Sequence, residues 1–240
     1  MIRIENLHKS FDDKLVLRGV DLEILDGEVM VILGSSGCGK SVLLKHLIGL
    51  MMPDEGSVIV DGTDITSLSK RALYEVRRNF GMLFQSAALF DSMTVYENVS
   101  LGLTEHSPLS EAEKREIVRD KLELVGLSDT EEMSPSELSG GMRKRVGLAR
   151  AICMDPAIVL YDEPTTGLDP VIGDTINDLI QRLQSRLNIT SVVVTHDMRS
   201  AFMVADRMAM LSNGKIHFVG TSKEIEASDD PEVREFLAHR

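Results

Sequence analysis

The sequence has no tryptophan, only two cysteines, and aromatic residues make up just 4% of its 240 residues. It also lacks long apolar runs, since no stretch approaches the roughly 20 residues that a membrane-spanning helix needs. The first residues enter an alternating strand pattern and show no secretory signal. We therefore expect that any work at a membrane depends on another chain for the membrane-spanning part.

The chain has few cysteines and more acidic than basic residues. These two features argue against a zinc site and against binding of nucleic acid. Cys38 and Cys153 have no CxxC neighbour, which predicts that there is no zinc site and that the compartment is reducing. The 38 acidic residues outnumber the 26 basic ones, for a net charge of −12. Sequence-independent binding of nucleic acid needs a basic surface, so we expect no nucleic-acid partner.

Apolar periodicity indicates an α/β fold that is interrupted by a helical segment. Apolar and polar residues alternate over residues 2–24, which predicts strands, and the apolar runs 29–33, 157–161 and 191–195 are typical of buried parallel strands. Between about residues 107 and 151 the charges are dense and the apolar residues take helical spacing. The sequence thus predicts a helical subdomain inserted into an α/β core.

A glycine-rich loop lies between a predicted buried strand and a predicted helix. Its sequence, which fits G-x-x-x-x-G-K-[ST], is Gly34-Ser35-Ser36-Gly37-Cys38-Gly39-Lys40-Ser41. Glycines let consecutive backbone N–H groups point at phosphate oxygens, and the N-terminus of the helix adds to this attraction. We expect Lys40 to reach the β- and γ-phosphates and Ser41 to bind Mg²⁺. A chance glycine turn seldom has this context, so the loop predicts a nucleotide site.

Two adjacent carboxylates follow the apolar run 158–161. Asp162 and Glu163 stand at the predicted carboxyl end of this strand. In a P-loop fold, Asp162 is expected to hold Mg²⁺ directly or through water, and Glu163 to polarise the attacking water as a general base. Adjacent acids at a strand end are often only solvated, so this interpretation depends on the P-loop that precedes them.

A second glycine turn stands before a basic segment with helical spacing, residues 143–150. The turn reads Leu138-Ser139-Gly140-Gly141-Met142 and resembles the Leu-Ser-Gly-Gly-Gln signature of the ABC ATPases, of which P-loop kinases and small GTPases have no counterpart. The resemblance implies that Ser139, Gly140 and Gly141 contact the γ-phosphate of ATP bound to a second copy of the chain. Two chains then enclose two nucleotides. The alternative is a plain helix cap by Ser139.

The same resemblance implies roles for four single residues. Phe11 takes the place of an aromatic that stacks on adenine, although a lone phenylalanine is more often a core residue. Gln85 matches the Q-loop glutamine, which contacts the metal or water. Asp169, in Thr166-Gly167-Leu168-Asp169, lies in the loop that crosses the dimer. His196 matches the switch histidine near the γ-phosphate and acts in catalysis with Glu163, whereas an isolated histidine is usually structural or solvated.

The resemblance covers essentially the whole chain and implies its architecture. We expect an α/β fold with a P-loop NTPase core of the RecA-like type, an N-terminal antiparallel β-subdomain and an inserted α-helical subdomain. A single ABC ATPase domain is expected over residues 1–240, with the core in about 1–90 and 155–240 and the helical subdomain in about 91–154. The implied reaction is hydrolysis of ATP to ADP and phosphate, with ATP and Mg²⁺ bound.

Two local features resemble the ATPase of Mla/Mce-type lipid transport systems: Met142, in place of the signature glutamine, and residues 82–99 around Gln85. This implies phospholipid transport between membranes through a partner permease, together with an MCE-domain lipid-binding protein. The chain is then peripheral at the cytoplasmic face of the inner (plasma) membrane. Five apolar residues are candidates for a groove that receives the permease, or else for the core: Phe84, Leu89, Phe90, Met93 and Val95.

Other functions are weighed against these features. Soluble ABC proteins of DNA repair carry a long coiled-coil insertion, and those of translation carry two cassettes in tandem, neither of which is in this chain. A binding module without activity conflicts with the intact Asp162-Glu163 pair. The ATPase of another ABC importer, such as an amino-acid importer, stays open because fold and motifs do not name the cargo.

Overall fold

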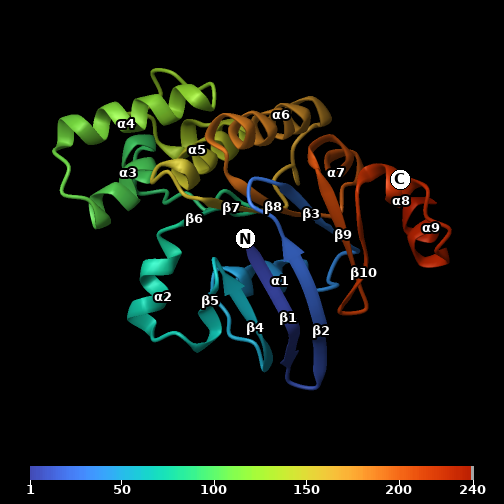
Figure 1. The fold of residues 1–240 in the computed structure, drawn as a ribbon. Coiled ribbons are helices and arrows are strands. Elements are labelled where there is room, and N and C mark those ends of the chain that lie inside the picture. Colours follow the sequence, from blue (N-terminus) through green and yellow to red (C-terminus); the bar gives the residue numbers. More distant parts are fainter. Residues whose placement is uncertain (239–240) are drawn as a thin grey trace. The chain divides into compact units, whose positions relative to one another are not determined.

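The computed structural model describes residues 1–238, which form two compact units (Figure 1). One unit contains residues 1–77 and 190–238, and the other contains residues 78–189. The second unit is larger than the predicted helical subdomain, because it also includes two strands and a long helix of the α/β core.

The first unit contains an antiparallel sheet with the strand order β2-β1-β4-β5. Its strands are β1 (Ile2–Phe11), β2 (Lys14–Ile24), β4 (Glu55–Val60) and β5 (Thr63–Asp64). Ile2 and Ile4 of β1 are buried while Arg3 and Glu5 between them are exposed, as expected where a sheet covers a core with one face. The predicted N-terminal antiparallel β-subdomain is confirmed.

The first unit also contains parallel strands. β3 (Val29–Leu33) pairs in parallel with both β8 (Thr190–Thr195) and β9 (Arg207–Ser212), and β9 continues through the turn Asn213-Gly214 into antiparallel β10 (Lys215–Gly220). Every residue of β3 and β8 is buried, which explains their continuous apolar runs. The helices of this unit are α1 (Lys40–Leu47), α2 (Lys70–Arg77), α7 (Met198–Val204), α8 (Ser222–Glu226) and α9 (Pro231–Ala238), with the short η1 (Ile65–Ser67).

The second unit combines two parallel strands with four α-helices. β6 (Phe80–Leu83) pairs with β7 (Ile158–Asp162). The helices are α3 (Val95–His106), α4 (Glu111–Leu124), α5 (Gly140–Ile152) and α6 (Pro170–Leu187), with the short η2 (Pro135–Glu137). Reciprocal capping boxes fix the starts of α3 and α4, where Thr94 pairs with Glu97 and Ser110 with Glu113. The predicted helical segment is confirmed, and it begins earlier than residue 107, at Val95.

Helix α5 packs closely against β6 and the loop that follows it, because two glycines remove side chains from the contact. A Cβ atom at Gly81 would lie 2.1 Å from the Ala151 carbonyl oxygen. A Cβ atom at Gly147 would lie 2.9 Å from Cδ1 of Leu83 and 3.1 Å from Cβ of Ala87. The backbone of α5 therefore lies directly against the strand and loop that carry Gln85.

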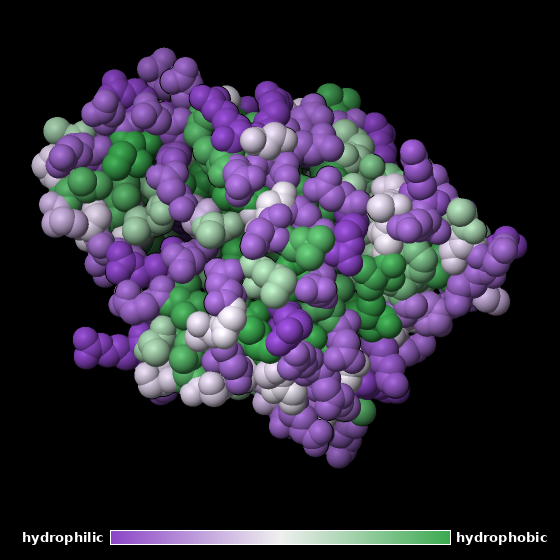
Figure 2. All heavy atoms as spheres, viewed as in Figure 1, coloured by the Kyte–Doolittle hydropathy of each residue, from purple (hydrophilic) through white to green (hydrophobic). Residues whose placement is uncertain are grey.

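Hydrophilic residues cover most of the face shown in Figure 2, with smaller hydrophobic groups between them. Among residues 1–238, no helix has both the length and the apolar character that a membrane crossing requires.

The contact between α5 and β6 predicts that Gly81→Ala destabilises the fold. The added methyl group meets backbone atoms, which cannot rotate away as a side chain can, so we expect a loss of about 1–3 kcal/mol in the free energy of unfolding. The measurement is the urea midpoint. Gly173→Ala is the matched control, because its Cβ lies at an ordinary 3.6 Å from Thr165 within helix α6; we expect that variant to be unchanged or more stable. A wild-type midpoint for Gly81→Ala would contradict the close packing.

Candidate active site

The glycine-rich loop connects β3 to α1 in the first unit and leaves the start of α1 open to an anion. Gly37 and Gly39 take left-handed backbone conformations, with φ of 79° and 110°. Gly39 is the N-cap of α1, no side chain caps the helix, and its first turn holds no acidic residue. The partial positive charge at the start of this helix, which no side chain caps, favours a phosphate.

Lys40 is buried beneath this loop. Its ammonium donates to the carbonyl oxygens of Gly34 (2.8 Å) and Ser35 (3.1 Å). Gly34 has no room for a side chain, because a Cβ atom would lie 2.5 Å from the Leu211 carbonyl oxygen. The loop is thus a cradle that a Cβ would fill, and two of its carbonyl oxygens accept from the Lys40 ammonium. The loop residues fit the phosphates of a nucleotide.

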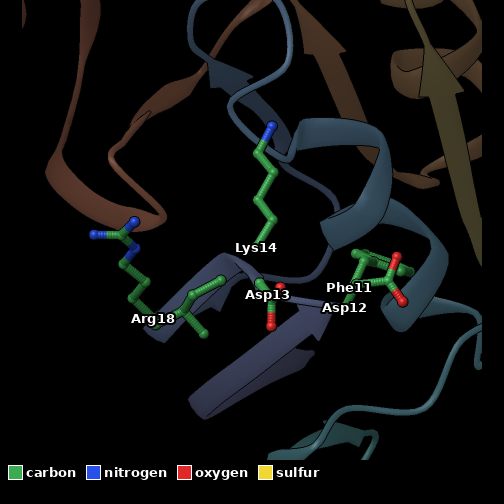
Figure 3. Close-up of a pocket in the computed structure, with 6 residues that line it drawn as sticks. Phe11, Asp12, Asp13, Lys14 and Arg18 are labelled. Atoms are coloured by element: carbon green, nitrogen blue, oxygen red, sulfur yellow. The ribbon is translucent and has the colours of Figure 1, made fainter.

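Phe11 and His196 are both exposed in the first unit. Phe11 ends β1 with 40% of its surface exposed, so it is not a core residue, and the Lys9 ammonium lies 5.7 Å from its ring centroid. It lines a surface pocket with the residues of the following turn and of early β2 (Figure 3). His196 directly follows β8, and the next residue, Asp197, caps α7.

The two adjacent carboxylates lie at the carboxyl end of β7 in the second unit, as predicted. Asp162 is the last residue of the strand, and both it and Glu163 are buried. Glu163 has a φ of 48°, a left-handed conformation that is uncommon for a residue with a side chain. Its Oε2 accepts a hydrogen bond from the Thr166 hydroxyl (3.0 Å). The chain therefore fixes the direction of this carboxylate before any ligand binds.

Lys144 of α5 lies next to this pair, although none of the sequence motifs predicted a role for it. It is buried, and its ammonium donates to the carbonyl oxygens of Gln85 and Glu163. Burial lowers the pKa of Lys144 to about 8, and the charges of Asp162 and Glu163 oppose this shift. The sequence does contain a sign that Lys144 is buried. It stands three residues after Gly141 and four before Leu148, and this spacing puts all three on the buried face of the helix.

Gln85 follows β6, and its side chain is exposed while its carbonyl oxygen binds Lys144. Ala87 and Ala88 after it take left-handed conformations, with φ of 61° and 48°. Arg150 of α5 donates to their carbonyl oxygens, at 2.6 Å to Ala87 and 2.7 Å to Ala88. Helix α5 thus holds the loop 85–88 through three carbonyl groups.

The apolar segment after this loop is only partly a surface. Phe90 is 50% exposed, and Phe84, Leu89 and Met93 are half-buried. Val95 is fully buried, so its candidacy for an apolar groove was wrong; it is the first residue of α3 and part of the core.

The signature turn begins helix α5. The Ser139 hydroxyl is the N-cap and accepts from the Met142 N–H (3.2 Å). A hydroxyl that accepts a hydrogen bond can still donate one, so the cap and a phosphate contact are compatible. Gly141 lies against α6, where a Cβ atom would be 2.6 Å from Cγ2 of Ile172.

Asp169 is the N-cap of α6. Its Oδ1 accepts from the N–H groups of Val171 and Ile172, both at 3.1 Å. Its carboxylate is exposed and its direction is fixed by these bonds.

The predicted site residues divide between the two units. Residues 1–77 and 190–238 hold Phe11, the loop Gly34–Ser41 and His196, and residues 78–189 hold the rest. The predicted Mg²⁺ ligands are the hydroxyl of Ser41, the amide of Gln85 and the carboxylate of Asp162. These are oxygen donors of the kind that Mg²⁺ prefers, so the donor set fits this ion. No group of three or more His, Cys, Asp or Glu residues that could hold a metal occurs within the described part of the chain.

Comparisons of the whole chain with known proteins identify its family. The sequence profile described as ABC transporter matches residues 17–166. The probable ribonucleotide transport ATP-binding protein mkl of Mycobacterium leprae is 47% identical over 239 residues, which cover 100% of this chain and 69% of that protein. The intermembrane phospholipid transport system ATP-binding protein MlaF of Haemophilus influenzae is 43% identical over 237 residues, 99% of this chain and 90% of that one.

The fold of the chain is also similar to that of a solved structure. The dimeric post-hydrolysis state of an ATP-binding cassette bound to ADP and Pi matches with a TM-score of 0.85 and 33% identity. The match covers 92% of this chain and 98% of that chain. Because the family profile spans more than half of the sequence and the relatives cover nearly all of it, the chain belongs to the ABC transporter family and is an ABC ATPase with a P-loop NTPase fold.

Proposed function

We propose that this chain is the ATPase subunit of a transporter that moves phospholipid between membranes. The observation that carries the ATPase assignment is Glu163, a buried carboxylate at the end of β7 that Thr166 holds in one direction. The cargo rests on the resemblance of residues 82–99 and Met142 to lipid-transport ATPases and on the name of the MlaF relative.

ATP is bound, in this proposal, by a single ABC ATPase domain that includes both units. The N–H groups of Gly34–Ser41 cradle the phosphates, and Lys40 exchanges its two carbonyl partners for phosphate oxygens, which are stronger acceptors because they are charged. Phe11 offers an exposed ring face to adenine. Ser41, Gln85 and Asp162 hold Mg²⁺, which when bound neutralises charge on the β- and γ-phosphates.

Hydrolysis requires two copies of the chain. Ser139, Gly140 and Gly141 of each copy close over the γ-phosphate bound to the other, and Asp169 lies in the loop between the copies. Glu163 accepts a proton from the attacking water as general base, and His196 orients the γ-phosphate. Closure of the two copies drives the coupled permease, and hydrolysis reopens them.

The partners in this proposal are a second copy, an integral-membrane permease and an MCE-domain lipid-binding protein. The half-exposed Phe90, with Phe84, Leu89 and Met93 near it in sequence, supplies apolar surface for the permease. The chain is then peripheral at the cytoplasmic face of the inner membrane.

The cargo has two further candidates. The mkl relatives are named for ribonucleotide transport and share 47–48% of residues with this chain, more than the MlaF relatives share. An amino-acid importer is the other. We favour phospholipid because the chain spans 90% of the MlaF protein of Haemophilus influenzae and only 69% of the mkl protein of Mycobacterium leprae.

Replacing Glu163 by Gln tests the ATPase assignment. Glutamine keeps the shape and an oxygen for the Thr166 hydroxyl but does not accept the proton, so we expect ATP turnover to fall at least about 100-fold. ATP affinity should be retained. The measurement is phosphate release by the purified transporter, together with binding of a fluorescent ATP analogue. Glu116→Gln, an exposed carboxylate on α4 of the same unit, is the control and should behave as wild type. Wild-type turnover by Glu163→Gln would refute the general-base role.

A pull-down of the tagged chain from its native membranes in mild detergent tests the cargo and the partners. Mass spectrometry should identify a multi-spanning permease, an MCE-domain protein and bound phospholipid. A permease recovered with a solute-binding protein, or with a nucleotide or amino acid as the bound small molecule, would contradict the phospholipid assignment and leave the ATPase assignment intact.

A further inference from the structure

Lys144 is a basic side chain that contacts both of the loops in residues 78–189 that bear predicted chemistry. It projects from α5, the helix that the signature turn begins, and only 4% of it is exposed. Its ammonium binds the carbonyl of Gln85 and, at 3.2 Å, that of Glu163. These carbonyls belong to segments 78 residues apart in sequence that no shared strand or helix contains.

The Gln85 and Glu163 carbonyls lie in loops with left-handed residues, which need hydrogen bonds to keep their conformation. Glu163 takes a left-handed conformation, and so do Ala87 and Ala88 just after Gln85. Such conformations persist when surrounding contacts hold them. Arg150 supplies these contacts at Ala87 and Ala88, and the Thr166 N–H supplies a local one at the Glu163 carbonyl. Lys144 adds a bond from one side chain to both the Gln85 end of the first loop and the peptide of Glu163.

We propose that Lys144 is a positioning residue for ATP hydrolysis, which acts by tying the backbones of Gln85 and Glu163 to the signature helix. It touches neither nucleotide nor water. A change at the signature turn is passed along α5 to the general base of the same copy, because α5, the loop 85–88 and Glu163 are held as one body. This inference rests on the proposed ATPase function and adds a link between two parts of it.

An apolar side chain in this place removes one donor from each of the two carbonyl oxygens, although that of Glu163 keeps the Thr166 N–H at 3.3 Å. The tie between the two loops is then lost, and the backbone movement that follows alters the direction of the Glu163 carboxylate. Arginine keeps the charge and several donors, so it preserves the link if it fits. A merely structural lysine would affect stability without a selective effect on turnover.

The test measures kcat and KM for ATP, and the affinity for a fluorescent ATP analogue, on the purified transporter with Lys144→Met, Lys144→Gln and Lys144→Arg. We expect Lys144→Met to lower kcat at least tenfold, with KM and affinity within about twofold of wild type. Lys144→Arg should recover most of the lost rate. Lys121→Met is the matched control: Lys121 is also buried in the same unit but binds the exposed carboxylate of Asp155, and its loss should leave kcat unchanged.

The outcomes separate this inference from the ATPase assignment. Unchanged kcat in Lys144→Met, or an equal loss in Lys121→Met, overturns the positioning role even if Glu163→Gln is inactive. If Glu163→Gln itself keeps wild-type turnover, the ATPase assignment fails first. Should Lys144→Met not fold, Lys144→Gln replaces it, because the amide keeps a donor of shorter reach; a kcat equal to wild type in that variant also overturns the proposal.

Discussion

Lys40 and Lys144 are buried, Arg150 is half-buried, and all three have backbone carbonyl oxygens as partners. Lys40 binds carbonyls of the loop that precedes it, Lys144 binds those of Gln85 and Glu163, and Arg150 binds those of Ala87 and Ala88. A buried cation is stable only when such partners replace its water. The loops must therefore take conformations that turn their carbonyls toward the cation, and these are the loops that carry the chemistry.

Two helices begin at glycine turns, and the difference between their starts suits two kinds of contact. Helix α1 has no side-chain cap and no acid in its first turn, and such a helix start attracts an anion. Helix α5 is capped by Ser139, which satisfies one N–H group and still has a hydroxyl proton to donate. The start of α1 suits continued binding of the phosphates. The start of α5 suits a contact that forms when two copies close and is lost when they open.

The features that were predicted well are those that depend on residues adjacent in the sequence. The glycine loop before α1, the carboxylates after β7 and the apolar runs of β3 and β8 are each set by residues next to one another. The sequence did not predict the bonds of Lys144, Arg150 and Thr166, because their partners are distant carbonyls or depend on a left-handed peptide. Alanines at 87 and 88 carry no signal for such a conformation, which tertiary contacts impose. Val95 was misplaced for a related reason: the apolar pattern does not reveal which residues face the core.

The most direct test of the central claim is a structure of the Glu163→Gln protein, in its transporter, with ATP and Mg²⁺. Two ATP molecules are predicted, each with its phosphates on the N–H groups of residues 34–41 of one copy and its γ-phosphate against Ser139 and Gly140 of the other. ATP held by one copy alone, with residues 138–142 of the second copy turned away from it, would contradict the shared site.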